Sequence, residues 1–73
     1  MNGIYRETVR SFNNRIIGFI DTLPNGDKEV RDSYNRYLGK YDKHLNVTRD
    51  SMGRMLYKGD QSSMLFNDKS NRR

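Results

Sequence analysis

The chain contains no cysteine, and this feature most constrains what its 73 residues can fold into. Disulfides and cysteine-ligated zinc, the usual staples of small domains, are therefore excluded. The length allows one domain with one modest core, and a chain this short buries only roughly 60% of the surface that its unfolded form exposes. Self-association often makes up for such a shortfall in stability, so a homodimer is a hypothesis.

Apolar residues recur at helical spacing over most of the chain. Over 5–23 they step by three and four residues, which predicts an amphipathic helix of about five turns. A second stripe over 30–45 has the same spacing, and Met52 and Met55 belong to a third, shorter helix. The sequence therefore predicts an all-α fold, a small domain of three helices. The long stripe over 5–23 is the expected dimer seam.

The segment 23–27 separates the first two stripes. It combines Pro24, the dipeptide Asn25-Gly26 and Asp27, which together indicate a helix stop followed by a capping aspartate. A β-hairpin turn is the alternative interpretation of the same residues. We expect the helical break because the flanking residues follow a period near 3.6 rather than 2.

The last part of the chain is more polar than the rest. The apolar triplet 64–66 is expected to fold back on the core, with a peptide that binds a partner as the alternative. Residues 67–73 carry few apolar groups and are expected to fray. The predicted organisation is a helical domain over 1–60 and a partly disordered tail over 61–73, without an internal repeat.

The segment from Leu38 to Gly59 is the most specific pattern in the sequence. Set as a helix-turn-helix, it places Asn46 at the turn, where the chain needs a left-handed conformation that asparagine tolerates. Thr48 then caps the following helix. The positions that would lock the two helices together are all apolar: Tyr41, Leu45, Val47, Met52 and Met55.

The string from Leu45 to Leu56 resembles the turn and recognition helix of bacterial and phage helix-turn-helix regulators, and the resemblance covers residues 38–59. It implies a helix-turn-helix-like corner and a transcriptional regulator that binds double-stranded DNA, with the recognition helix in the major groove. The residues implied at the DNA interface are Thr48, Arg49, Asp50, Ser51, Gly53 and Arg54, flanked by Lys40, Lys43 and Lys58 as phosphate contacts. A solvated polar face without a target is the alternative interpretation.

The formal charge of +5 agrees with an anionic partner, and solubility alone is the alternative explanation. Arginine is more abundant than lysine, and its planar fork suits phosphate and guanine edges. The basic residues are spread evenly along the chain instead of forming a basic arm. A positive surface must therefore arise from folding.

The remaining composition argues against catalysis. The single histidine, His44, forms neither a metal site nor a catalytic relay by itself, and no glycine-rich phosphate loop is present. No catalytic residue, metal or cofactor is therefore expected. The chain has no long apolar run and no signal-peptide pattern, so no membrane partner is expected and a cytoplasmic location is predicted.

Two functions other than DNA binding remain open. One is a small phage-encoded effector that binds and inhibits a host protein, such as RNA polymerase or a defence enzyme. The other is a virion structural component. The long apolar stripe and the triplet 64–66 favour these alternatives.

Overall fold

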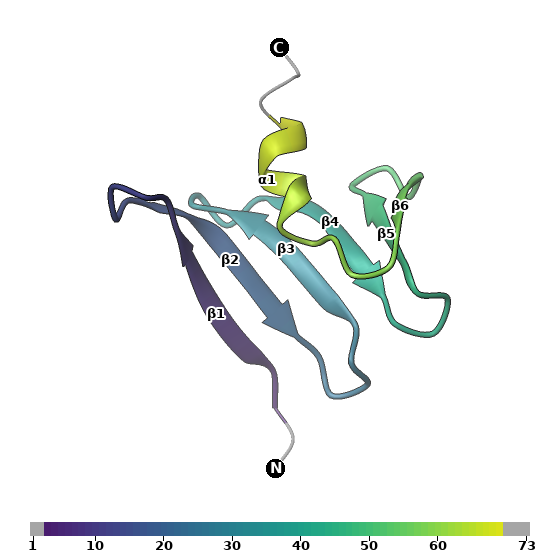
Figure 1. Cartoon of the computed structure of the whole chain (residues 1–73). Helices are drawn as coiled ribbons and strands as arrows, with labels where there is room; N and C mark the ends of the chain where they lie inside the picture. The colour runs from purple at the N-terminus through teal and green to yellow at the C-terminus, as the bar shows by residue number, and fades with distance from the viewer. Residues whose placement is uncertain (1–2, 70–73) are drawn as a thin grey trace.

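The computed structural model describes residues 3–69 and shows one antiparallel sheet with a short helix against one of its faces (Figure 1). The six strands are neighbours in chain order, so the sheet is a simple meander. Its elements are β1 (Tyr5–Arg10), β2 (Ile16–Thr22), β3 (Lys28–Asp32), β4 (Tyr37–Asp42), β5 (Val47–Asp50), β6 (Met55–Lys58) and α1 (Met64–Lys69).

The prediction of an all-α domain of three helices is wrong. Strands β1 and β2 form a hairpin where the first helix was expected, and β3 and β4 form another over most of the second stripe. Residues 38–59 form strands and turns, so the helix-turn-helix-like corner is wrong as well. The segment 23–27 is the hairpin turn that was the alternative interpretation, closed by the Leu23 N–H donating to the Asp27 carbonyl at 2.8 Å.

An apolar residue at the tip of a turn explains why a sheet was mistaken for a helix. Val9 packs against the core and Ile16 lies beyond the turn on the other face of the sheet. Phe12, between them, is part of the turn itself and is fully exposed. The three residues are spaced like a helix stripe, although they share no face. The absence of alanine agrees with this fold, because alanine favours helices and is depleted in strands.

Four of the five hairpins share one turn geometry. In each, the first turn residue accepts a hydrogen bond from the residue three positions on and donates one to the residue four positions on. This is the three-residue loop that ends in a left-handed residue. The left-handed positions are filled by the residues that tolerate them, Asn14, Gly26, Asn35 and Gly53, with φ between 67° and 97°. Asn46 is also left-handed, with φ 58°, as predicted, but in the β4–β5 turn.

An internal repeat underlies three of these hairpins, so the expectation of no repeat is wrong. Segments 9–18, 30–39 and 48–57 each contain a strand end, a turn and the start of the next strand, with a one-residue register shift at the same place. Each carries an arginine before the turn and another after it. The equivalent positions are Arg10, Arg31 and Arg49; Ser11, Asp32 and Asp50; Asn14, Asn35 and Gly53; and Arg15, Arg36 and Arg54.

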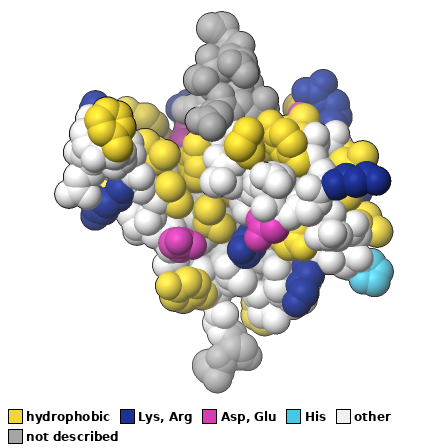
Figure 2. Space-filling model, in the orientation of Figure 1, with side chains coloured by type: hydrophobic (Ala, Val, Ile, Leu, Met, Phe, Trp, Pro, Cys, Tyr) yellow, Lys and Arg dark blue, Asp and Glu magenta, His cyan; other side chains and the backbone are white. Residues whose placement is uncertain are grey.

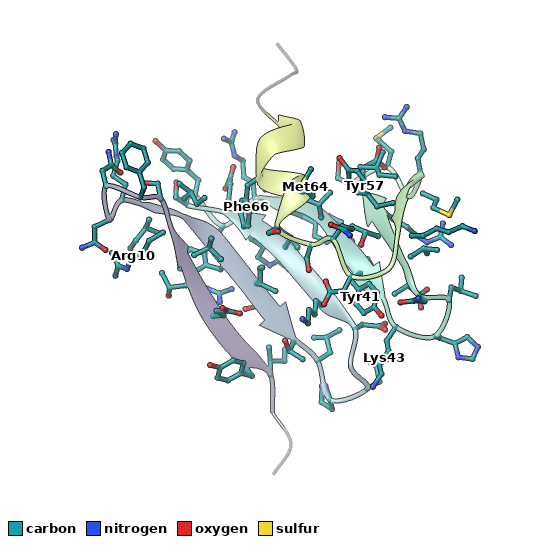
Figure 3. All side chains as sticks on the ribbon, in the orientation of Figure 1. Arg10, Tyr41, Lys43, Tyr57, Met64 and Phe66 are labelled. Atoms are coloured by element: carbon teal, nitrogen blue, oxygen red, sulfur yellow. The ribbon has the colours of Figure 1, made fainter. Side chains whose placement is uncertain are left out.

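The core lies between the sheet and α1. Leu65 of α1 (2% exposed) packs with Ile20 of β2 (9%) and Val30 of β3 (0%). Phe66 lies against Gly18 (Figure 3). The expectation that the triplet 64–66 folds back on the core is therefore confirmed. Of the residues 67–73 that were expected to fray, 67–69 belong to α1, and 70–73 lie outside the described residues.

The loop between β6 and α1 is fastened to the same face of the sheet. Thr48 Oγ1 donates to the Gly59 carbonyl at 2.8 Å and accepts a hydrogen bond from the Gln61 N–H at 3.0 Å. Lys28 Nζ donates to Asp60 Oδ2 at 2.7 Å. These bonds hold the chain end across one face, which we call the helix-covered face. No helix in residues 3–69 has the length and apolar character needed to cross a membrane.

Gly18 provides the sharpest test of this packing. A Cβ at Gly18 would overlap the Arg31 carbonyl oxygen and the Phe66 ring. Gly18→Ala should therefore lower the free energy of unfolding by about 1–3 kcal/mol, measured by denaturant titration. Gly3→Ala is the matched control, because nothing lies within 4 Å of a Cβ there. Equal stability of the two variants would contradict the packing of α1 on the sheet.

Candidate functional site

The second face of the sheet carries most of the charged strand residues. We call it the open face, because α1 and the loop before it lie on the helix-covered face. Side chains alternate between the two faces along each strand, so the register assigns them. Six basic strand residues belong to the open face, Arg6, Arg10, Arg31, Lys40, Arg49 and Lys58, against three acidic ones, Asp21, Glu29 and Asp42.

Part of this charge is neutralised within the sheet. Arg6 Nε donates to Asp21 Oδ1 at 2.7 Å, and its guanidinium lies 4.6 Å from the centre of the Phe19 ring. Arg31 pairs with Glu29 at 3.3 Å and lies 5.8 Å from the centre of the Tyr37 ring. The hydrogen bond from Arg6 lowers the pKa of Asp21 despite the opposing effect of burial. The centre of the open face is thus a layer of arginine planes on aromatic rings.

Other cations of the open face have no carboxylate partner among the described residues. Arg10 and Arg49 each donate to the carbonyl of the left-handed residue in the following turn, Asn14 at 3.2 Å and Gly53 at 3.0 Å. A backbone carbonyl does not neutralise the charge of the arginine. Each of these bonds also uses only one of the five N–H donors of the guanidinium. Lys58 on β6 is exposed and also forms no ion pair with a described residue. The open face therefore keeps an uncompensated positive charge.

Three turns lie side by side at one end of the sheet, the upper end in Figure 1. We call the segments 11–15, 32–36 and 50–54 the first, second and third turn, and together the three-turn rim. Alternate hairpins in a meander are two strands apart, which places neighbouring turns about 10 Å apart. The β2–β3 and β4–β5 turns lie at the opposite end (Figure 1).

The second and third turns are held by an aspartate–arginine pair. Asp32 Oδ1 accepts the N–H groups of Tyr34 and Arg36 at 2.9 and 2.8 Å, and its Oδ2 accepts from Arg36 Nε at 2.9 Å. Asp50 holds Arg54 in the same way. Burial tends to raise the pKa of Asp32 and of Asp50, but these hydrogen bonds outweigh it, so the pKa of each is lowered.

The first turn departs from this pattern. Ser11 takes the place of the aspartate, so the arginine after the turn, Arg15, has no carboxylate to bind there. Arg15 forms no ion pair with any described residue. The first turn is consequently the part of the rim with the most uncompensated positive charge, contributed by Arg10 and Arg15. Figure 3 shows Arg10 at this end of β1.

The rim also exposes large apolar side chains. Phe12 (102% exposed), Tyr34 (79%) and Met52 (79%) are turn residues of the first, second and third turns. Figure 2 shows hydrophobic atoms protruding at the β1–β2 turn with Lys and Arg atoms beside them. Each of the three neighbouring turns thus presents one large apolar side chain to solvent at the same end of the sheet.

The structure places most of the sequence-predicted DNA contacts in the third turn or in the interior and not on a helix. Thr48 is fully buried and fastens the loop after β6. Asp50 and Arg54 are the pair that holds the third turn, and Ser51 and Gly53 belong to that turn. The prediction that these residues form a recognition helix is therefore wrong. The Asp50 carboxylate and the Arg54 guanidinium, both implied at the DNA interface by the resemblance, bind each other.

The structure brings some of the predicted phosphate contacts together and separates others. Lys40 and Arg49 are cross-strand partners, and Lys58 lies on the same open face. Lys40 Nζ is 3.4 Å from Asp27 Oδ2, so its charge is compensated. Lys43 lies in the β4–β5 turn at the opposite end of the sheet, beside a hollow that it shares with His44 (Figure 3).

The sequence-predicted site lacks five arginines of the open face and the rim: Arg6, Arg10, Arg15, Arg31 and Arg36. A signal for four of them is present in the sequence. Arg31-Asp32-Ser33 and Arg49-Asp50-Ser51 begin two copies of one motif, and each copy has an arginine after the turn. Aligning the first turn to this motif places Arg10 and Arg15 at equivalent positions.

Comparisons with protein-family models, with curated proteins and with solved structures find no match for this chain. They do not bear on the resemblance of residues 38–59 to helix-turn-helix regulators. The candidate site accordingly stands on its geometry: uncompensated cations on the open face, with Arg10 and Arg49 at the rim end and Lys58 at the other end, and exposed apolar side chains on the rim.

The lowered carboxylate pKa values predict loss of stability in acid. Each of the aspartates concerned has a lower pKa in the folded chain than in the unfolded chain, where it is about 3.9. As the pH falls through about 4, the unfolded chain therefore binds protons before the folded chain does, and the free energy of unfolding decreases. The thermal unfolding midpoint should be flat from about pH 7 to 5 and fall below about pH 4. The aspartates with lowered pKa are Asp21, Asp27, Asp32, Asp50 and Asp60.

A paired variant identifies the carboxylates responsible. Asp32→Asn combined with Asp50→Asn should lower the midpoint at pH 7 and flatten the fall in acid, because the two turn pairs are lost. If the thermal unfolding midpoint of the unmodified chain stays constant or rises as the pH falls to 3, these ion pairs are contradicted.

Proposed function

We propose that the protein is a non-enzymatic binding protein that holds nucleic acid by its phosphates against the open face. One observation carries the proposal. Arg10, Arg49 and Lys58 bring positive charge without a carboxylate partner to the face of the sheet that lies away from α1. The surplus of basic residues on that face agrees with the formal charge of +5.

The identity of the cations supports a phosphate ligand. Guanidinium groups hold phosphate oxygens through two parallel N–H bonds, and they are less strongly hydrated than ammonium groups. Arg10 and Arg49 occupy equivalent positions in the repeat and are held by equivalent bonds to the turns, which limits the side-chain freedom lost on binding. Both lie at the rim end of the open face, on β1 and β5, so a linear polyanion that runs across the strands can contact both at once.

The shape of the sheet limits the mode of binding. Six strands at about 4.8 Å spacing form a face roughly 24 Å wide, broader than a major groove of about 12 Å. The whole face is therefore suited to contacts with the backbone and not to base edges inside a groove. Such contacts give affinity without sequence preference. Double-stranded DNA, the partner expected from the sequence, remains one form of this ligand.

Nucleic acid as the ligand agrees with the predicted cytoplasmic location. The homodimer hypothesis loses its expected seam, because the stripe over 5–23 is a hairpin. An effector of a host protein and a virion component stay predictions. A protein partner would cover the exposed side chains Phe12, Tyr34 and Met52 without requiring the open face.

Salt-dependent binding tests the proposal. A labelled duplex of mixed sequence, titrated by fluorescence anisotropy between about 50 and 200 mM salt, should bind with an affinity that falls steeply with salt. Arg10→Ala combined with Arg49→Ala should weaken binding and reduce the salt slope by about two. The matched control, Lys28→Ala combined with Lys43→Ala, removes the same charge away from the open face and should bind more tightly than the arginine variant.

Two results would contradict the proposal. Absence of binding to any nucleic acid at the lowest salt removes it altogether. Equal losses in the two double variants would show that net charge alone drives association, and would remove the open face as the site.

A further inference from the structure

We infer that the preferred ligand is a single strand, and that one of its bases is held in the hollow between the first and second turns of the rim. This rests on the proposed function, since the same strand would place its phosphates on the open face. The hollow has a volume of about 420 Å³, and its lining includes Phe12, Asn13, Arg15, Ile17 and Ser33. The hollow is open to solvent and therefore suits one face of a base and not an enclosed ligand.

Phe12 supplies the apolar surface that a base requires. Its ring is fully exposed at the tip of the first turn, and the turn bonds between Ser11 and Arg15 fix the backbone beneath it. Stacking of a base on an aromatic ring is tolerant of sequence, because every base has a π-face. Because the turn already orders the backbone, binding has to order only the side-chain torsions of Phe12.

Charge next to the ring supplies the contact with the backbone. Arg15 lines the hollow and has no ion pair with a described residue, because Ser11 stands where the other two turns have an aspartate. Arg10 lies just before the turn on the open face. The first turn thus combines one exposed ring with two uncompensated guanidinium groups. Asn13 and Ser33 add polar groups to the same lining.

The other two turns lack part of this combination. The Tyr34 ring lies 5.4 Å from the Arg36 guanidinium, which is itself bound to Asp32. Met52 carries no ring, and the arginine of its turn is bound to Asp50. The inference is therefore specific to the first turn.

A single strand fits this arrangement better than a duplex. The bases of a duplex are stacked within the helix and do not present a face to a protruding ring, whereas the bases of a single strand can be splayed onto aromatic side chains. A duplex would meet the rim with sugar and phosphate only and leave Phe12 without an apolar contact. The exposed ring therefore favours the single strand.

A tryptophan reporter tests the inference, because the chain contains no tryptophan. Phe12→Trp should keep its affinity for a single-stranded mixed-sequence oligonucleotide, and its fluorescence should be quenched on binding. Tyr5→Trp is the control, since Tyr5 is also exposed but lies at the other end of β1. Its fluorescence should change little. Phe12→Ala should weaken single-strand binding on the order of tenfold with an unchanged salt slope, and Tyr5→Ala should not.

The outcomes separate the inference from the proposed function. Tighter binding of the single strand than of a duplex of equal length, with quenching at position 12, supports the inference. Equal binding of single strand, duplex and heparin, with no effect of Phe12→Ala, overturns it and leaves phosphate binding by the open face intact. Absence of binding to every polyanion at low salt overturns both. Circular dichroism of each variant establishes that the sheet is retained.

Discussion

A left-handed residue near the end of each hairpin turn sets the register of the whole sheet. The residues at these positions are asparagine or glycine, which adopt a positive φ at low cost. Because side chains alternate along a strand, a slip by one residue would exchange the two faces. Asn14, Asn35 and Gly53 therefore keep the arginine before each rim turn on the same face. The charge of the open face is a consequence of turn chemistry.

The short helix completes this division of the two faces. Leu65 and Phe66 cover the small residues Gly18 and Gly39 and the apolar Ile20 and Val30, so the core needs only one side of the sheet. The other side is left to long cationic side chains, some of which rest on aromatic rings. A chain with so few apolar residues can form one apolar core layer, which lies between α1 and the sheet. The second face of the sheet is then available for a ligand.

The residues that form turns could be identified from the sequence, but whether the segments between them are helices or strands could not. The left-handed Asn46 was predicted, and so was the return of residues 64–66 to the core, whereas the hairpin turn at Asn25-Gly26 was only the alternative to a helix stop. The helical spacing over 5–23 misled because Phe12 is exposed at a turn and breaks the alternation expected of strands. The candidate site was predicted in part: Arg49 and Lys58 lie on the open face. Arg10 and Arg15 emerge only from the repeat.

The most direct test of the account is a nuclear magnetic resonance titration that follows the arginine side-chain Nε–H groups. A single-stranded oligonucleotide added to the labelled full chain should shift the signals of Arg10, Arg15 and Arg49 and the backbone amides of the first turn. The backbone amide signals of Leu65 and Lys28, on the helix-covered face, should not shift. Shifts concentrated on α1 and the helix-covered face, with the arginines unchanged, would contradict the open face as the binding surface.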